Sequence, residues 1–253
     1  MSSGRSVLSS GPLTYGPGLG ATPLASEGSD PNRSGLHPLA VVVAKWPEPG
    51  RVKTRLCPPL SPDGAARLAM ALLLDLADAV RRCRDLEWGI AYAPEAAREA
   101  FARRFPDAAL FPQGEGDLGE RMDRVVSRGL EAGHRSVLLL GGDLPALPEG
   151  LPSQAAGVLL RGADLVLSPS TDGGYSLIGL SRPCPELFAR MPWSGPEVLS
   201  ETLRRAESLG LRTGLLAPVP DCDTPDDLAR LIEHRALPRH TAEWVKRYRL
   251  GKG

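Results

Sequence analysis

The stretch LAVVVA, residues 39–44, is a continuous apolar run in which three of the six residues are β-branched. A strand with one face in water alternates apolar and polar side chains, whereas this run has no polar position. The run therefore predicts a strand buried on both faces, as in a sheet covered by helices. The next apolar stretch, residues 61–83, predicts a helix in which Ser61 is the N-cap and Pro62 is the first residue.

Strands and helices are expected to alternate along the rest of the chain. Further strands are expected at residues 86–93, 107–111, 136–143, 163–170, 173–180 and 211–219. Further helices are expected at residues 94–105, 120–133, 195–210 and 224–236. This order predicts a single α/β domain with three layers, helix, sheet and helix, and with a mainly parallel mixed sheet.

The two ends of the chain are expected to lie outside that domain. Residues 1–36 are rich in Gly, Ser and Pro and show no hydrophobic periodicity, which predicts a disordered tail. The domain is expected to span residues 37–237. Residues 238–253 are expected to form a C-terminal tail with a short helix around Trp244.

Composition limits the classes of function. Hydrophobic residues make up 42% of the 253 residues and aromatic ones only 5%, so the core should be aliphatic. Thirty basic residues balance thirty acidic ones, which argues against a nucleic-acid or membrane-surface protein. No apolar run reaches the length of a membrane span, about 18 to 20 residues.

The cysteines and the N-terminal sequence indicate a cellular compartment. Four widely separated cysteines without a C-x-x-C pair are expected to be reduced thiols. The N-terminal segment lacks the apolar core of a secretory signal, so a cytoplasmic protein is expected. The oligomeric state is not indicated by any pattern in the sequence.

Loops that follow strands are the expected ligand sites, because ligands of such sheets bind at the carboxyl ends of the strands. The loop AKWPEPGRVKTRL, residues 44–56, carries Lys45, Arg51, Lys53 and Arg55. Clustered cations of this kind can bind phosphates, although the loop matches neither a P-loop nor a Rossmann fingerprint. A solvated surface loop is the alternative interpretation, and charge alone does not decide between the two.

Acidic residues follow two other expected strands. Asp143 comes directly after a buried strand and two glycines, where a carboxylate can hold Mg²⁺ or Mn²⁺ or can simply cap a turn. In DCDTPDDL, Thr224 and Asp227 fit a helix capping box. Capping does not account for Asp221 and Asp223, which would complete a cation site if the fold brings them to Asp143.

Two further loops have a structural and a functional interpretation. DGG at residues 172–174 lies between two expected strands, which by itself favours a hairpin turn over a sugar or phosphate contact. GEGDLGERM at residues 114–122 carries several acids, including Asp117, and by default these are solvated charges before a helix.

Five stretches, taken together and in this order, carry a family resemblance: AKWPEPGRVKTRL, GDLGERM, GGDLPALP, DGGYSLIGL and DCDTPDDL. They run from about residue 39 to 235 and resemble a bacterial family of glycosyltransferases with the A-type nucleotide-diphospho-sugar transferase fold. Members of that family are labelled arsenosugar-biosynthesis or radical-SAM/selenodomain-associated transferases. The first stretch also resembles the guanylyltransferase that activates 2-phospholactate, and the last is similar to molybdenum-cofactor nucleotidylyltransferases.

The resemblance implies roles for particular residues. The implied ligands of a divalent ion, Mg²⁺ or Mn²⁺, are Asp143 and Asp223. The implied partners of nucleotide phosphates are Lys45, Arg51, Lys53 and Arg55. The implied neighbours of the sugar or acceptor are Asp172, Gly173, Gly174 and Tyr175, with Asp172 as the general base, and in the same pocket Asp117 and Gly119. The sequence departs from the family pattern in lacking a D-x-D triplet before LPALP, where Gly141 stands at the first acid.

The expected function is metal-dependent transfer of a sugar from a nucleotide-sugar to a small-molecule acceptor. Nucleotidyl transfer from a nucleoside triphosphate to a phosphorylated acid or sugar phosphate is the first alternative, because a shared fold does not choose the reaction. A non-catalytic protein that binds nucleotide-sugars is the second alternative, and the missing acidic triplet motivates it.

Overall fold

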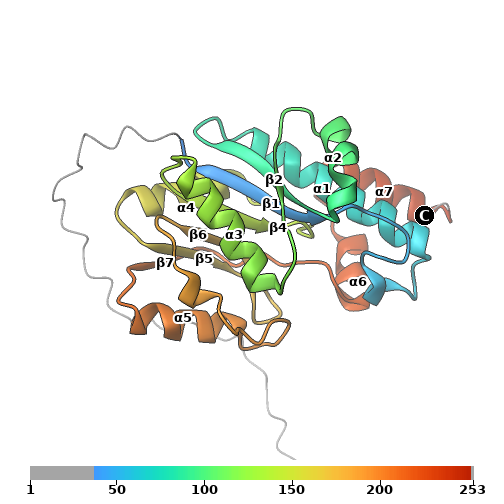
Figure 1. Ribbon diagram of the computed structural model, residues 1–253. Coiled ribbons are helices and arrows are strands. Elements are labelled where there is room, and N and C mark those ends of the chain that lie inside the picture. Colours follow the sequence, from blue (N-terminus) through green and yellow to red (C-terminus); the bar gives the residue numbers. More distant parts are fainter. Residues whose placement is uncertain (1–36, 252–253) are drawn as a thin grey trace, which may run out of the picture. The chain divides into compact units, whose positions relative to one another are not determined.

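A seven-stranded sheet forms the centre of the computed structural model, which describes residues 37–251 (Figure 1). The strands are β1 (Leu39–Lys45), β2 (Glu87–Ala93), β3 (Ala109–Pro112), β4 (Val137–Gly141), β5 (Leu165–Pro169), β6 (Tyr175–Leu180) and β7 (Thr213–Leu215). The tail predicted for residues 1–36 lies outside the described residues.

The strand order is β3-β2-β1-β4-β6-β5-β7. All neighbouring strands are parallel except that β6 runs antiparallel to both β4 and β5. The predicted mainly parallel mixed sheet is therefore confirmed. Because β6 follows β5 as the second strand of a hairpin, the β5–β6 turn lies at the edge where β1 and β4 end.

The helices are α1 (Pro62–Arg81), α2 (Arg98–Arg104), α3 (Leu118–Glu131), α4 (Leu151–Leu160), α5 (Val198–Ser208), α6 (Pro225–Glu233) and α7 (Arg239–Arg249). Short 3₁₀ turns occupy Thr54–Leu56, Glu95–Ala97 and Pro185–Leu187. Helix α4 was not among the expected helices, because its sequence is apolar nearly all round and gives no amphipathic period. Strand β7 is shorter than the strand expected at residues 211–219, but the chain beyond it continues to bond to β5.

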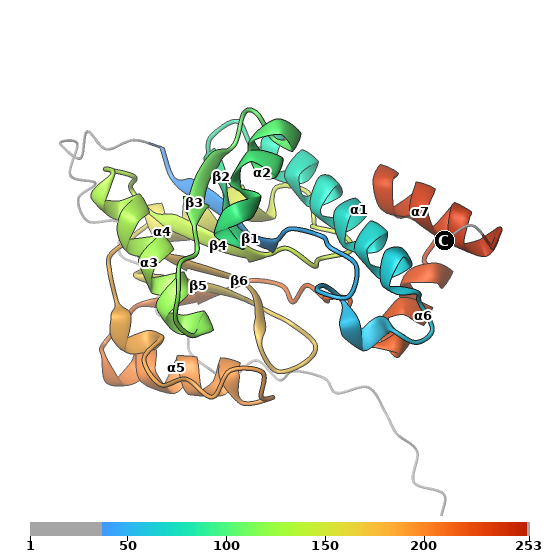
Figure 2. The ribbon, with the colours of Figure 1, turned by 45° about the vertical axis from the view of Figure 1, so that its right-hand side comes forward.

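The sheet is buried on both faces, as LAVVVA predicts. On β1, Ala40 and Val42 belong to a core cluster with α1, α2 and α4, whereas Leu39 and Val41 belong to a cluster with α3 and α5. Figure 2 shows α1 on one side of the sheet and α3 and α5 on the other. The three-layer architecture is therefore confirmed.

The helix starts predicted from local sequence are confirmed in detail. The Ser61 hydroxyl accepts the Gly64 N–H at 3.0 Å and caps α1, with Pro62 as the first helical residue. Thr224 caps α6, and the Asp227 carboxylate accepts the Thr224 N–H at 2.7 Å, which completes a capping box. Such bonds satisfy amides that a helix start leaves without intrahelical partners.

Helices α6 and α7 pack outside the sheet, against α1 and the loop after β1. Their apolar side chains share a third buried cluster with that loop and with the outer face of α1, and Figure 2 shows α7 beside α1. The buried carboxylate of Asp75 on α1 accepts the N–H groups of His240 at 2.9 Å and Thr241 at 2.7 Å. Asp75 thus caps the start of α7 from a different helix.

No helix within residues 37–251 is both long and apolar enough to cross a membrane. Cys57, Cys83, Cys184 and Cys222 are free thiols.

We expect Asp75→Ala to lower the free energy of unfolding by about 2–4 kcal/mol, because the buried amide of Thr241 and the partly buried amide of His240 lose their acceptor. Chemical denaturation measures the change. Asp78→Ala is the matched control on the same helix: its carboxylate pairs with Arg81 at 3.1 Å and is partly exposed, so its loss should cost less than about 1 kcal/mol. Equal stabilities of the two variants would contradict the assigned role of Asp75.

Candidate active site

Loops from four strands converge at one edge of the sheet. Strands β1 and β4 end there, and the turn between β5 and β6 lies at the same edge. Beyond β7 the chain still follows β5, because the N–H groups of Leu216 and Val219 bond to Leu167 O at 2.8 Å and Pro169 O at 2.9 Å. This extension carries residues 221–223 back to the edge where β4 ends.

Three carboxylates from two of these loops gather at this edge. One oxygen each of Asp143, Asp221 and Asp223 lies within 4.8 Å of the others. Burial, together with the charges of Asp172, Asp143 and Asp223, raises the pKa of Asp221 to about 6. The fold therefore brings together the three acids on which the cation-site hypothesis depended. Asp221 and Asp223 lie 78 and 80 residues after Asp143 in the sequence.

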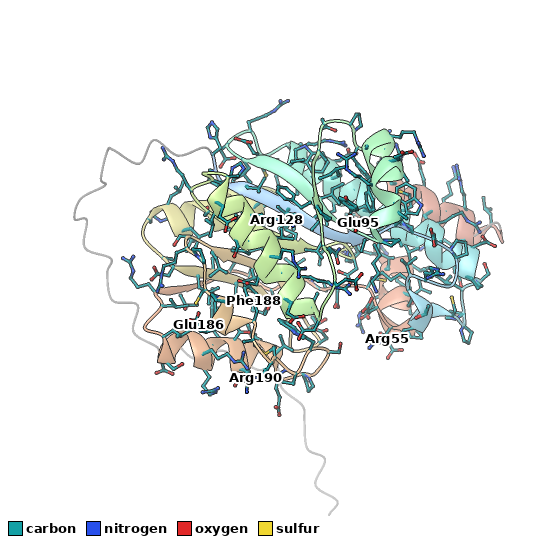
Figure 3. The ribbon with its side chains drawn as sticks, viewed as in Figure 1. Arg55, Glu95, Arg128, Glu186, Phe188 and Arg190 are labelled. Atoms are coloured by element: carbon teal, nitrogen blue, oxygen red, sulfur yellow. The ribbon has the colours of Figure 1, made fainter. Side chains whose placement is uncertain are left out.

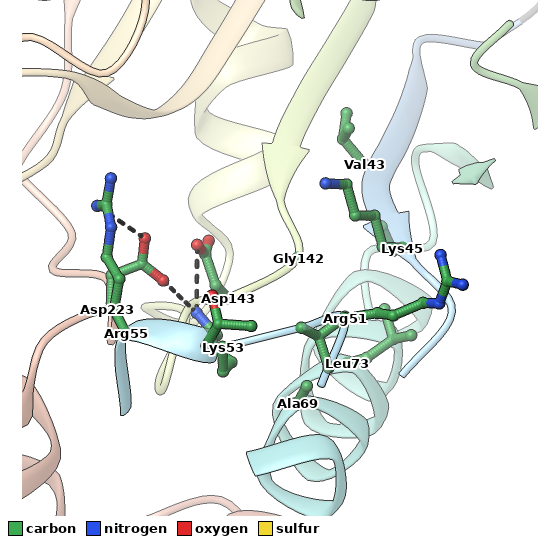
Figure 4. Close-up of a pocket in the computed structure, with 13 residues that line it drawn as sticks. Val43, Lys45, Arg51, Lys53, Arg55, Ala69, Leu73, Gly142, Asp143 and Asp223 are labelled. Carbon is green, nitrogen blue, oxygen red and sulfur yellow. Dashed lines mark hydrogen bonds and ion pairs between the residues drawn. The ribbon is translucent and has the colours of Figure 1, made fainter. Parts of the chain in front are cut away.

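Lys53 forms the centre of this group. Its Nζ lies 2.8 Å from Asp223 Oδ1, 3.3 Å from Asp143 Oδ2 and 2.8 Å from the carbonyl oxygen of Cys222 (Figure 4). Its side chain is 7% exposed. Burial alone would lower the pKa of Lys53, but the charges of Asp143 and Asp223 outweigh burial and the pKa is raised. Lys53 is therefore a fixed cation between two acidic loops.

The other three cations of the loop after β1 are more exposed. The side chain of Arg51 is 79% exposed and its Nε pairs with Glu48 at 3.4 Å. Arg55, 68% exposed, lies 4.0 Å from Asp223. With Lys45 and Lys53 these arginines line a cavity of about 330 Å³ that also reaches Asp143 and Asp223. In Figure 4, Lys45 and Arg51 lie apart from the group formed by Lys53 and the two acids.

A second cavity, of about 390 Å³, adjoins the first and shares Arg55, Asp143 and Asp223 with it. Its walls come from β4, the β5–β6 turn, the start of α3 and the loop before α5. We call the first the cationic cavity and the second the acidic cavity, because Asp172 and Asp221 also line the second.

Asp172 stabilises the turn between β5 and β6 and also lines the acidic cavity. Its Oδ1 accepts the Gly174 N–H at 3.0 Å and the Ser170 hydroxyl, which fixes the turn between β5 and β6. Gly173 has φ +90°, and a Cβ there would lie 2.1 Å from Pro196 O, so only glycine allows this approach of the turn to the loop before α5. Asp172 and Gly174 of this turn line the acidic cavity, whereas Gly173 does not.

Tyr175 lines the acidic cavity but its hydroxyl is buried. Burial raises the pKa of this hydroxyl, and Thr202 on α5 offsets part of the rise. The hydroxyl therefore lies against α5, and the ring is the part of Tyr175 that lines the cavity wall.

Asp117 and Gly119 lie at the start of α3 and have structural contacts there. Asp117 caps the helix in a capping box with Glu120, and a Cβ on Gly119 would lie 2.6 Å from Phe188 O. Neither is among the residues that line the two cavities; their neighbours Leu118 and Met122 line the acidic cavity.

Sequence reasoning missed part of the acidic cavity wall. Leu118, Met122, Trp193, Ser194 and Val198 line it, and no polar motif marks them. Asp221 was recognised as unexplained by capping, and its distance from Asp143 in the fold is what makes it part of the site.

Comparisons with known proteins agree with this architecture. A family profile described as "Uncharacterized protein conserved in bacteria (DUF2064)" matches residues 76–195, a span that includes Asp143 and Asp172 but not Lys53 or Asp223. Comparison with curated proteins gives no significant match.

Solved structures share the fold. A protein from Desulfovibrio desulfuricans G20, provisionally assigned as a nucleotide-diphospho-sugar transferase, is 28% identical with a TM-score of 0.75, over 83% of this chain and 97% of that chain. A 4-diphosphocytidyl-2C-methyl-D-erythritol synthase is 14% identical with a TM-score of 0.51, over 77% and 96% of the two chains. The corresponding synthase from Anaerococcus prevotii DSM 20548 is 10% identical with a TM-score of 0.51, over 77% and 93%. The two synthases show the fold alone.

We expect Lys53→Met to lower the free energy of unfolding by about 1–3 kcal/mol near neutral pH, because Asp143 and Asp223 lose the cation between them. Added Mg²⁺ or Mn²⁺ should then raise the melting temperature of this variant more than that of the wild type. Thermal unfolding with and without the ions measures both effects. Lys45→Met, which removes an exposed cation, is the control; an equal loss in the two variants would contradict the role of Lys53.

Stability without divalent ions should depend on the ionisation of Asp221. A carboxyl with a raised pKa is more readily protonated in the folded than in the unfolded state, so the free energy of unfolding falls as the pH rises from about 4, the unfolded pKa, to about 6, the folded pKa. Asp221→Asn should therefore melt above the wild type at pH 7.5 and close to it at pH 4, in thermal unfolding with EDTA. The control, Glu149→Gln, removes an exposed carboxylate. Identical pH profiles of Asp221→Asn and the wild type would refute this.

Proposed function

We propose that this protein is a metal-dependent transferase that moves a sugar from a nucleotide-sugar to a small-molecule acceptor. The observation that carries the proposal is the separation of charge about Asp143 and Asp223. A cavity lined by four cations lies on one side of these acids, and a cavity lined by further acids lies on the other. A nucleotide-sugar is likewise divided, with its charged diphosphate between a nucleoside and an uncharged sugar.

The carboxylate group has the chemistry of a Mg²⁺ or Mn²⁺ site. Asp143, Asp221 and Asp223 offer three carboxylate oxygens within 4.8 Å of one another, and hard divalent ions prefer oxygen ligands. Asp143 and Asp223 are the proposed ligands, and Asp221 is the third carboxylate within reach. A bound divalent ion would act as a Lewis acid that offsets negative charge on the phosphate oxygens.

The cationic cavity is the proposed phosphate site. Lys53 is held in place by its bonds to Asp223 and Cys222, so its charge needs no reorganisation when a phosphate arrives. Arg55 lies at the boundary of the two cavities, where it can donate to the phosphate next to the transferred group. Fixed cations stabilise the charge that develops on a leaving nucleoside diphosphate more than they stabilise the ground state. Lys45 and Arg51 would add a more strongly screened attraction, because they are exposed.

The acidic cavity is the proposed place of the sugar and the acceptor. Asp172 is fixed by the β5–β6 turn, and a positioned carboxylate can orient a hydroxyl and take its proton during transfer. The backbone of Gly174 and the ring of Tyr175 line the same wall. Asp117 and Gly119 would contribute indirectly, since they set the position of the start of α3.

Similarity to the Desulfovibrio protein supports a nucleotide-diphospho-sugar transferase. Nucleotidyl transfer remains the second candidate, because the fold is also that of the two 4-diphosphocytidyl-2C-methyl-D-erythritol synthases. The narrower resemblance to arsenosugar-biosynthesis transferases and the cytoplasmic location stay predictions.

We expect the purified protein to release a nucleoside diphosphate from a nucleotide-sugar when Mg²⁺ or Mn²⁺ and an acceptor are present, and to stop when EDTA is added. A panel of nucleotide-sugars and hydroxyl acceptors, with chromatography of the nucleotide product, measures this. Asp143→Asn should lower the turnover number by about 100-fold or more, because it removes a ligand of the ion.

Glu149→Gln, an exposed change in the loop after β4, is the control and should keep the wild-type rate. Pyrophosphate release from a nucleoside triphosphate, without release of a nucleoside diphosphate from any nucleotide-sugar, would identify a nucleotidyltransferase instead. Tight nucleotide binding without turnover on the whole panel would identify a binding protein.

A further inference from the structure

The acidic cavity has an uneven distribution of charge that bears on the acceptor. Four carboxylates line it, those of Asp143, Asp172, Asp221 and Asp223, against one cationic side chain, Arg55. Arg55 stands at the boundary with the cationic cavity and faces Asp223 at 4.0 Å. The rest of the acidic cavity, as far as the described residues line it, has no positive side chain.

Arginines on the flanking elements have other partners. On α3, Arg121 Nε donates to Gly116 O at 2.9 Å. On α5, Arg205 donates to Ala189 O at 2.6 Å and pairs with Glu201 at 2.6 Å. Arg190 lies on the loop before α5, well apart from Arg55 in Figure 3, and does not line the cavity. The contacts of Arg121 and Arg205 hold these two cations to groups of the protein itself.

One part of the cavity lining is apolar. Leu118 and Met122 of α3, Trp193 of the loop before α5 and Val198 at the start of α5 line it. The start of α3 lies close to the loop before α5, and the absence of a side chain at Gly119 permits this approach, because a Cβ there would lie 2.9 Å from the Trp193 ring. Ser194, with φ +69°, adds a small polar side chain beside Trp193. The apolar wall is therefore built from two elements that pack tightly together.

The structure assigns to this cavity an acceptor without anionic groups: an uncharged hydroxyl compound whose apolar part lies against Leu118, Met122, Trp193 and Val198. The inference rests on the proposed sugar transfer and narrows its acceptor class. Its hydroxyl group lies toward Asp172, and no phosphate or carboxylate is accommodated beyond Arg55.

The physical reason is the cost of bringing an anion into this cavity. Lys53 and a bound divalent ion would offset the charges of Asp143 and Asp223, but no cationic side chain beyond Arg55 lines the cavity beside Asp172. A phosphorylated acceptor would place its charge next to Asp172, and like charges repel even with solvent screening. An apolar group against Leu118 and Trp193 instead displaces water from these side chains. A nucleotidyltransferase that acts on a phosphorylated acid would need the opposite, a cationic wall beyond the carboxylates.

A matched set of glycosides tests the inference by binding alone. Phenyl β-glucoside, phenyl β-glucuronide and phenyl β-glucoside 6-phosphate differ in charge at one carbon. Ligand-observed NMR titration uses the full chain with Mg²⁺ and whichever of ADP, CDP, GDP, UDP and TDP gives the largest thermal shift. We expect the neutral glucoside to bind at least about 10-fold more tightly than the 6-phosphate, and the difference to shrink as salt is added.

A charge introduced into the apolar wall gives an independent test. Leu118 is 44% exposed at the start of α3, so a lysine there can be accommodated. Leu118→Lys should reduce the preference for the neutral glucoside several-fold, because it supplies the missing cation. Leu160→Lys, a similarly exposed change on α4 outside both cavities, is the matched control and should keep the wild-type preference. Circular dichroism and the melting temperature show that both variants are folded.

Tighter binding of the 6-phosphate or the glucuronide by the wild type would overturn the inference, as would binding of none of the three compounds. An unchanged preference in Leu118→Lys would also overturn it. The readout is affinity, so the result does not depend on turnover. The two proposals therefore fail by different results. Pyrophosphate release from a triphosphate would refute sugar transfer, whereas a preference for the anionic glycosides would refute the acceptor class.

Discussion

The ammonium group of Lys53 joins three segments that are far apart in the sequence. It bonds to Asp223 and to the carbonyl oxygen of Cys222, and it faces Asp143. Burying a lysine costs free energy unless opposite charges and hydrogen bonds compensate for it, and here both are present. Conversely, Asp143, Asp221 and Asp223 would repel one another without a cation between them. The position of the loop after β1 and the gathering of the three acids are thus mutually dependent.

This arrangement also sets the direction of the site. The cations of the loop after β1 remain on one side of the acids, and Asp172 with the apolar residues of α3 and the loop before α5 lies on the other. A substrate with a charged middle and an uncharged end fits across Asp143 and Asp223 in one orientation. In the proposed sugar transfer, the phosphates would stay on the cationic side and the neutral group would be transferred.

Several residues combine a structural bond with a place at the site. Asp172 closes the β5–β6 turn and lines the acidic cavity. Asp117 caps the start of α3, and Gly119 packs that start against Phe188. Both residues thereby set the position of Leu118 and Met122. A short polar motif read from the sequence cannot separate these roles, because turn formation and ligand contact favour the same residue types.

The sequence by itself determined what depends on neighbouring residues. LAVVVA predicted a strand buried on both faces, Ser61 and Thr224 predicted helix starts, and the alternation of elements predicted the three-layer fold, because burial periodicity and capping act over a few residues. The cations of residues 44–56 and the acids at 143, 221 and 223 were visible as candidates. Only the tertiary structure decided that Lys53 alone among those cations is buried between the acids and that Trp193 and Leu118 close the second cavity. Those contacts depend on strand order and on the packing of α3 against the loop before α5, and such distances between remote residues leave no local signature in the chain.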